Sequence, residues 1–108
     1  MRVELTEAAL TDLDEIYNYI ARDSIQAAEK VLADLKSAMQ RLGDLPGMGH
    51  ERKDVKNPHY RFWRVYSYMA AYVVRGDVVY IVRIVHGSRD VERVFDPHRS
   101  SGVDPKNN

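Results

Sequence analysis

Several residues suited to chemistry lie together where an apolar run ends. The run from Val78 to Val85 leads without a loop into a turn that contains His86, Arg89 and Asp90. His86 and Asp90 are four residues apart, so they could form an acid–base pair. The structural alternative is that His86 packs at the strand end and Asp90 accepts from nearby backbone amides. Arg89 lies at the exposed turn and has the better functional prospects as a contact to a partner.

Arg83 is the one charged residue inside this apolar run. It either pairs with an acidic residue from a helix or points out of a half-open sheet face. A partly covered structural ion pair is the usual outcome for such an arginine. On an open face, Arg83 would instead be available to a binding partner.

A second group of polar and mostly basic residues occupies the middle of the chain. It could form a basic rim that contacts phosphates or an acidic segment of a partner, or it could be a solvated loop and strand face. Its members are His50, Glu51, Arg52, Lys53, Lys56, His59, Arg61 and Arg64. Aromatic residues nearby could stack on bases, although in a covered sheet they are more often core. These are Tyr60, Trp63, Tyr66, Tyr68 and Tyr72.

The composition excludes several classes of site and of protein. There is no cysteine among the 108 residues, and the four histidines have no metal-binding spacing, so we expect neither a metal site nor a cofactor. Sixteen basic and sixteen acidic residues cancel, which argues against binding nucleic acid through bulk charge. No apolar run approaches the ~20 residues of a membrane helix, and the N-terminus has no signal core. We therefore expect a cytoplasmic protein.

The elements that would position these residues begin with a helical hairpin. Residues 2–5 read as a short edge strand, Thr6 as the N-cap of a first helix and Ser24 as a second N-cap. The first helix has an apolar stripe of Leu13, Ile16, Tyr17 and Ile20, and its polar residues are expected on other faces. These polar residues are Asp12, Asp14, Glu15 and Asn18. A second apolar stripe runs from Ala28 to Leu42, and Gly43 is expected to end the second helix.

A loop over residues 44–59 precedes three strand-like runs, at 60–65, 68–74 and 78–85. The last run has the composition of a central strand buried on both faces. Residues 75–77 predict a tight hairpin, and Gly87 with Ser88 predicts a sharp exit into a short helix. The predicted fold is α+β with the order β-α-α-β-β-β, a helical hairpin on a mainly antiparallel sheet and a short C-terminal helix. We expect one domain over residues 1–97 and a polar, flexible tail over 98–108.

This order and four segments of the chain resemble the ParE branch of the RelE/ParE toxin superfamily, also called plasmid stabilisation proteins. The segments are VELTEAALTDLDEIYNYIA, LPGMGHER, FWRVYSYMAAYVV and IVRIVHGSRD, and the resemblance covers residues 2 to about 95. It implies the toxin of a bacterial type II toxin–antitoxin system. RelE-like members cut messenger RNA on the ribosome, whereas ParE-like members are expected to inhibit DNA gyrase.

The residues favour the second activity. RNA cleavage needs several basic side chains and a proton carrier. Met69 stands where RelE carries a strand arginine, and Phe95 stands where RelE carries its C-terminal tyrosine. If the protein were a ribonuclease, Arg89, His86 and Arg61 would be its candidate catalytic residues. A tyrosine or histidine and several arginines converging on one open concavity would contradict the gyrase interpretation.

The resemblance also implies partners. A ParD-like antitoxin would wrap the toxin, giving a hetero-oligomer, and DNA gyrase would be the target, without sequence-specific binding of nucleic acid. The groove along the helical hairpin and an exposed sheet edge are the expected landing zone. Contact residues are expected to be Arg83, Arg89, Asp90, Leu10, Tyr17 and Ile20. A non-toxic binding module of the same fold is a further alternative.

Overall fold

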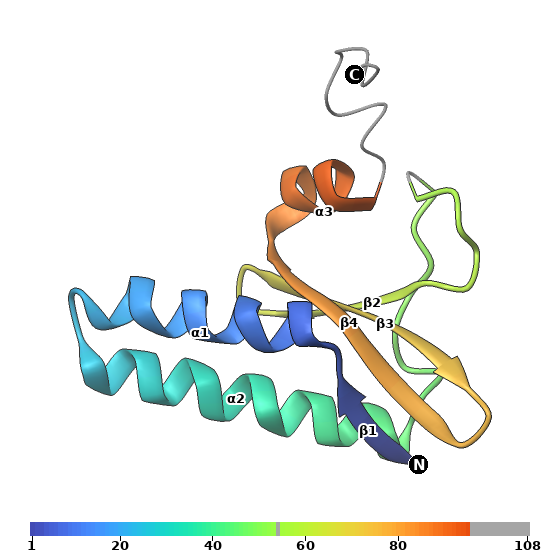
Figure 1. The fold of residues 1–108 in the computed structure, drawn as a ribbon, viewed down its shortest axis with the longest axis horizontal. Helices are drawn as coiled ribbons and strands as arrows, with labels where there is room; N and C mark the ends of the chain where they lie inside the picture. Colours follow the sequence, from blue (N-terminus) through green and yellow to red (C-terminus); the bar gives the residue numbers. More distant parts are fainter. Residues whose placement is uncertain (54, 96–108) are drawn as a thin grey trace.

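The computed structural model describes residues 1–53 and 55–95, with only the backbone of Ser88, Arg89, Asp90 and Glu92. A helical hairpin lies against one face of a twisted sheet, and a short helix rises from the end of the last strand on the other face (Figure 1). The elements are β1 (Arg2–Leu5), α1 (Glu7–Ala21), α2 (Ile25–Asp44), β2 (Arg61–Val65), β3 (Tyr68–Arg75), β4 (Val78–His86) and α3 (Gly87–Phe95). The predicted α+β fold and its element order are confirmed.

The sheet has the order β1-β4-β3-β2, so β1 and β2 are its edges and β4 is interior. The strands β2, β3 and β4 form the predicted antiparallel meander, while β1 pairs with β4 in parallel. Gly76 has a φ of +60° in the tight turn between β3 and β4, where glycine avoids the strain of a left-handed backbone. Gly87, with a φ of +71°, turns the chain from β4 into α3.

Both predicted helix N-caps are confirmed. The Thr6 hydroxyl accepts from the amide of Ala9, and the Ser24 hydroxyl accepts from the amide of Ala27. The expectation that Gly43 ends the second helix is wrong, because α2 continues through Asp44. At Gly43 a Cβ atom would lie 2.7 Å from Val3 Cγ2, so this glycine allows β1 to approach the helix.

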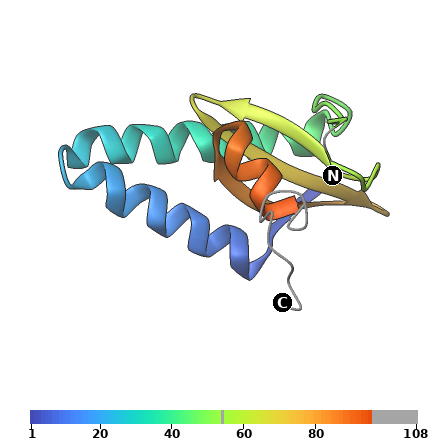
Figure 2. The ribbon, with the colours of Figure 1, turned by 90° about the horizontal axis from the view of Figure 1, so that it is seen from above.

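The hydrophobic core has two parts, one on each face of the sheet. Residues of α1 and α2 pack on the first face, with Tyr72, Ile81 and Ile84 among the buried strand residues. Trp63 and Tyr68 pack against this cluster, so these aromatic residues and Tyr72 serve as core. Figure 2 shows α3 across the opposite face, where its Val91 belongs to a second cluster with Val55, Phe62, Ala71 and Val85. Strand β4 contributes to both clusters, which confirms its prediction as a strand buried on both faces.

A β-bulge interrupts the pairing of β4 with β3. Ile81 pairs with Tyr72 and Arg83 pairs with Ala71, so Val82 is an extra residue in β4. Such a bulge increases the local twist and re-aims the neighbouring side chains. It lies just beyond the end of β1, whose last pair is Leu5 with Ile81.

Within the described part of the chain, no helix is long and apolar enough to cross a membrane. Residues 1–53 and 55–95 also bring together no set of three acidic, histidine or cysteine side chains that could hold a metal ion. The predicted boundary between residues 97 and 98 lies outside the described residues and stays a prediction.

Candidate functional site

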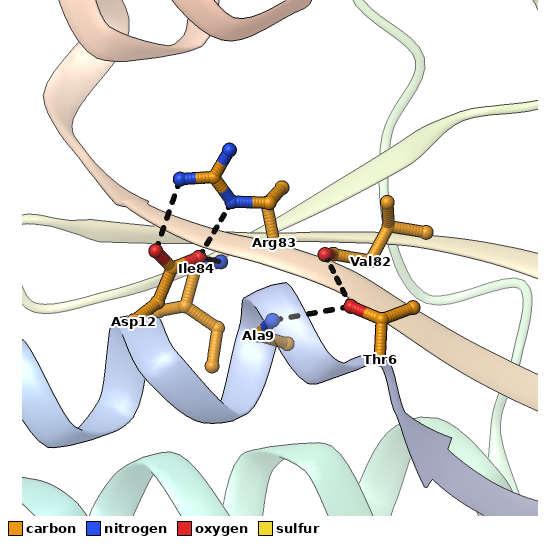
Figure 3. Close-up of polar contacts among 6 residues, drawn as sticks. All are labelled: Thr6, Ala9, Asp12, Val82, Arg83 and Ile84. Atoms are coloured by element: carbon orange, nitrogen blue, oxygen red, sulfur yellow. Dashed lines mark hydrogen bonds and ion pairs between the residues drawn. The ribbon is translucent and has the colours of Figure 1, made fainter.

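A carboxylate on α1 joins the first helix to the interior strand. Asp12 accepts from Arg83 Nε at 2.8 Å and from Arg83 Nη2 at 3.0 Å (Figure 3). The same carboxylate accepts from the backbone amide of Ile84 at 2.8 Å. The Asp12 side chain is only 9% exposed, and Arg83 is 32% exposed. The two-pronged contact confirms the prediction that Arg83 pairs with an acidic residue from a helix.

The end of β1 explains why these contacts form here. Beyond Leu5 no strand among the described residues pairs with this edge of β4, so its backbone groups need other partners. Thr6 donates from its amide to the carbonyl of Ile81 and from its hydroxyl to the carbonyl of Val82. Asp12 then accepts from Ile84, the next outward-facing amide. Asp12 lies outside the predicted apolar stripe as expected, but it is buried, and its carboxylate accepts from a backbone amide that no strand pairs with.

A cavity of about 410 Å³ opens beside this ion pair, where α1, β4 and α3 meet. From α1 it is lined by Asp12, Glu15, Ile16 and Tyr19. The other lining residues are Tyr68, Arg83, Ile84, Val85, His86, Arg93 and Val94. Its volume falls in the range of ~300–1,000 Å³ that is usual for binding pockets.

The electrostatics of the cavity are largely balanced. Hydrogen bonding to Asp12 raises the pKa of Arg83, with further contributions from the charges of Asp12 and Glu15, so the guanidinium stays protonated. Burial raises the pKa of Tyr68, and the nearby Tyr19 adds to this shift, so the phenol of Tyr68 stays neutral at physiological pH. Two arginines thus share the walls with two carboxylates.

These side chains include the types that RNA cleavage would need. Tyr19, Tyr68 and His86 converge on the cavity with Arg83 and Arg93. However, Asp12 already occupies two nitrogens of Arg83, and the Glu15 carboxylate stands on the same wall. A phosphate entering here would meet these two carboxylates as well as the two arginines, so the walls offer it no net positive charge. The convergence is real, but its charge does not suit a phosphate.

The other residues considered for cleavage have structural contacts. Arg61 donates from Nη1 to the carbonyl of Gly49, so it holds the loop that precedes β2. Met69 packs in the core of the second sheet face. Phe95 packs edge-on against Tyr60 and Phe62, with ring centroids 4.9 and 5.5 Å apart. In these positions Met69 and Phe95 act as hydrophobic core.

The middle basic group is divided between anchored and exposed members. Arg52 lies over the ring of Phe62 at 5.7 Å, and His50 stacks near Trp63 with centroids 6.2 Å apart. The residues exposed to solvent are His50, Glu51, Lys53, Lys56, His59 and Arg64. The arrangement is a charged surface along the loop and the edge strand β2.

The predicted contact residues on α1 lie away from the cavity. Leu10 is 53% exposed, while Tyr17 and Ile20 are half-buried. Leu10 and Tyr17 are seven residues apart, so they share one side of α1, whereas Asp12 and Tyr19 share another. The side chains of Arg89 and Asp90 lie outside the described part of the structure. Their expected roles, including a pair between Asp90 and His86, stay predictions, and so does the cap expected at Ser88.

Four residues of the cavity wall carry no site prediction from the sequence. The sequence predicts Asp12 and Glu15 only as polar residues of the first helix, and it assigns no role to Tyr19 or Arg93. One signal was present, since Asp12, Glu15, Ile16 and Tyr19 follow the three- and four-residue spacing of a single helix face. That face is a mixture of charge and aromatic rings, so an apolar stripe could not reveal it.

Comparison with known families finds one whose model matches residues 3–91, the ParE toxin of type II toxin–antitoxin system, parDE. A curated relative from Caulobacter vibrioides, Toxin ParE3, is 29% identical over 87 residues. That match spans 80% of this chain and 86% of the relative.

Solved structures give the same picture. A chain from the chromosomal ParDE TA system of P. aeruginosa aligns with a TM-score of 0.69 and 25% identity, covering 82% of this chain and 97% of that one. The conserved hypothetical protein HP0894 from Helicobacter pylori aligns with a TM-score of 0.54 and 17% identity, covering 82% and 96%. The second likeness supports the fold alone.

Proposed function

This chain belongs to the ParE toxin family of type II toxin–antitoxin systems, and on that premise we propose that it inhibits DNA gyrase by binding and is neutralised by a ParD-like antitoxin. The observation that carries the proposal is the family match over residues 3–91. Binding that favours one state of the gyrase–DNA complex needs differential affinity for that state and no catalytic residue in the toxin.

The contacts of individual side chains support a binding activity over cleavage. Met69 and Phe95 are partly buried and pack against the second hydrophobic cluster, and Arg61 donates to the carbonyl of Gly49. The Asp12 carboxylate compensates the charge of Arg83. In the cavity, Arg83 is therefore less available to neutralise a crowded phosphate.

An antitoxin partner is supported by the likeness to a ParDE system. We propose that its contacts include Leu10, Tyr17 and Ile20 on α1, and the undescribed side chains of Arg89 and Asp90. The β4 edge at Val82 and Ile84 is unsuited to an added strand. Thr6 already donates to the carbonyl of Val82, and Asp12 already accepts from the amide of Ile84. The antitoxin would then lie across the helices rather than extend the sheet at β4.

A supercoiling assay with purified gyrase tests the target. Added toxin should stop supercoiling and accumulate cleaved DNA, and toxin preincubated with its antitoxin should do neither. Heat-unfolded toxin serves as the matched control. Unchanged supercoiling at a large excess of folded toxin would contradict the proposed mechanism.

Ribosome-dependent RNA cleavage is a second candidate, favoured by the convergence of Tyr68, His86, Arg83 and Arg93 on one cavity. Primer extension on translated messages during expression separates the two activities. Codon-phased cuts would support cleavage, and their absence together with stalled replication would support the gyrase mechanism. Normal growth with abundant folded toxin and no antitoxin would indicate a non-toxic binding module.

A further inference from the structure

The cavity between α1, β4 and α3 has aromatic and aliphatic walls around a nearly neutral polar patch. Its apolar lining includes Ile16, Tyr19, Tyr68 and Val94. Tyr19 is 67% exposed, so a large ring stands at the mouth with little cover from the rest of the described chain. Such a concave site, open and lined by rings, suits a partner side chain with a large apolar surface.

The polar groups of the cavity restrict which kind of partner side chain can bind there. Asp12 accepts hydrogen bonds from Nε and Nη2 of Arg83, and no described residue accepts one from Nη1. A guanidinium whose charge is already compensated is a poor site for a second carboxylate next to Glu15. It can still stack on the face of an aromatic ring, or donate to a neutral oxygen. The patch therefore suits an aromatic side chain better than an anion.

The walls are also held in place before any partner arrives. Asp12 fixes Arg83 and the backbone of Ile84, and the ring of Tyr68 packs edge-on against His86 with centroids 5.3 Å apart. A preformed cavity spares the partner most of the cost of ordering the site. An aromatic side chain, which buries ~150–250 Å², would gain the most from it.

We propose that this cavity binds one aromatic side chain of the antitoxin, as the anchor of the complex. The proposal rests on the proposed antitoxin partnership and adds a second contact region to it. Leu10 and Tyr17 lie on the opposite side of α1, so the antitoxin would straddle this helix. A segment that folds as it binds can wrap a helix in this way.

The affinity of purified toxin for its full-length cognate antitoxin tests the proposal. Tyr19→Ala removes one wall of the cavity, and Glu15→Trp places a large side chain across its mouth. Both positions are exposed, so circular dichroism should report an unchanged fold for each variant. Each variant should weaken binding roughly 10- to 100-fold, the effect of losing an interface hot spot. Ile25→Ala is the matched control, because Ile25 is 61% exposed on α2 and lies outside the cavity.

A double-mutant cycle identifies the occupant. Each aromatic residue of the antitoxin is replaced by alanine against wild-type toxin and against Tyr19→Ala. One aromatic residue should show losses that are not additive with Tyr19→Ala, because both changes remove the same contact. Additive losses for every aromatic residue would overturn the proposal.

Two further outcomes separate this proposal from the proposed function. Wild-type affinity in both cavity variants, with the antitoxin still protecting gyrase, would reject the anchor and leave the partnership intact. No binding between wild-type toxin and antitoxin would reject both. Loss of gyrase inhibition by Tyr19→Ala with wild-type antitoxin affinity would assign the cavity to the target, and this proposal would be wrong.

Discussion

Two carboxylates connect the helical hairpin to the sheet, and they differ sharply in surroundings. Asp12 on α1 is buried, and it accepts from Arg83 and from the backbone of Ile84. Asp34 on α2 is at the surface, where it accepts from the Tyr66 hydroxyl and pairs with Lys30 at 3.4 Å. Both contacts hold a strand or turn against a helix. Only the first removes charged groups and a backbone amide from water.

The contribution of each contact to folding stability depends on its burial more than on the number of its hydrogen bonds. A surface pair competes with water and is screened by salt, so its net contribution is small. A buried pair is costly to form, and removing one partner leaves the other without compensation. Backbone strain also accompanies the surface contact. Its partner Tyr66 has a φ of +55°, an unfavourable backbone conformation for a residue other than glycine.

The largest expected effect comes from Asp12→Ala. This substitution removes the ion-pair partner of Arg83 and leaves the buried amide of Ile84 without an acceptor. The free energy of unfolding should therefore fall by about 3 kcal/mol. Urea denaturation of the purified toxin measures the change. Asp12→Asn, which keeps an oxygen for Ile84, should lose less. A loss for Asp12→Ala no larger than that for Asp34→Ala would erase the contrast.

Tyr72→Phe should have the next largest effect. The Tyr72 ring is fully buried, and its hydroxyl accepts from the Gly49 amide at 2.8 Å and donates to the carbonyl of Pro46 at 2.7 Å. Its removal leaves a buried donor unsatisfied, at a cost of about 2 kcal/mol. Thermal unfolding checks this, with Tyr80→Phe as the control on β4. Equal melting temperatures for the two variants would show that the loop does not depend on this hydroxyl.

Alkaline pH should weaken the same contact. Burial raises the pKa of Tyr72 above its usual value of 10.0, so the folded state binds this proton more tightly than the unfolded state. The stabilisation is complete below about pH 10 and is lost as the pH rises beyond it. The unfolding free energy of wild type should therefore fall more steeply above pH 10 than that of Tyr72→Phe. Parallel pH profiles would contradict the assignment.

The smallest effect is expected at the surface contact. The hydrogen bond from Tyr66 lowers the pKa of Asp34 and raises that of Tyr66, so the contact exists between the two titrations. It should be lost as the pH falls through the pKa of Asp34 or rises through that of Tyr66. Asp34→Asn should leave the denaturation midpoint at neutral pH nearly unchanged, with any difference shrinking in high salt. A change as large as that of Asp12→Ala would reverse the comparison.

Periodicity and turn residues predicted most of the fold. The caps at Thr6 and Ser24, the turn at Gly76 and the two-sided burial of β4 follow from local chemistry, and local chemistry is what a sequence displays. The pairing of Arg83 with a helix acid was also predictable, because a charge inside an apolar strand needs a partner.

The cavity and the role of Asp12 could not be predicted in the same way. Aspartate is usually found at the surface, so its type predicts exposure. Asp12 lies against β4 at the place where β1 has already ended and its pairing is missing. The bulge at Val82 lies next to that end, and no glycine or proline at this position in the sequence indicates it. The predicted helix end at Gly43 is wrong for a similar reason. This glycine makes room for the N-terminus, which lies 42 residues earlier in the sequence.

The parallel pairing of Arg2 with Val78 sets the timing of assembly. A ribosome must synthesise nearly the whole chain before the N-terminal strand can meet its neighbour, so the sheet closes last. The two helices emerge early but have nothing to cover until then. Burial of the apolar faces of α1 and α2 therefore waits for the C-terminal half of the chain.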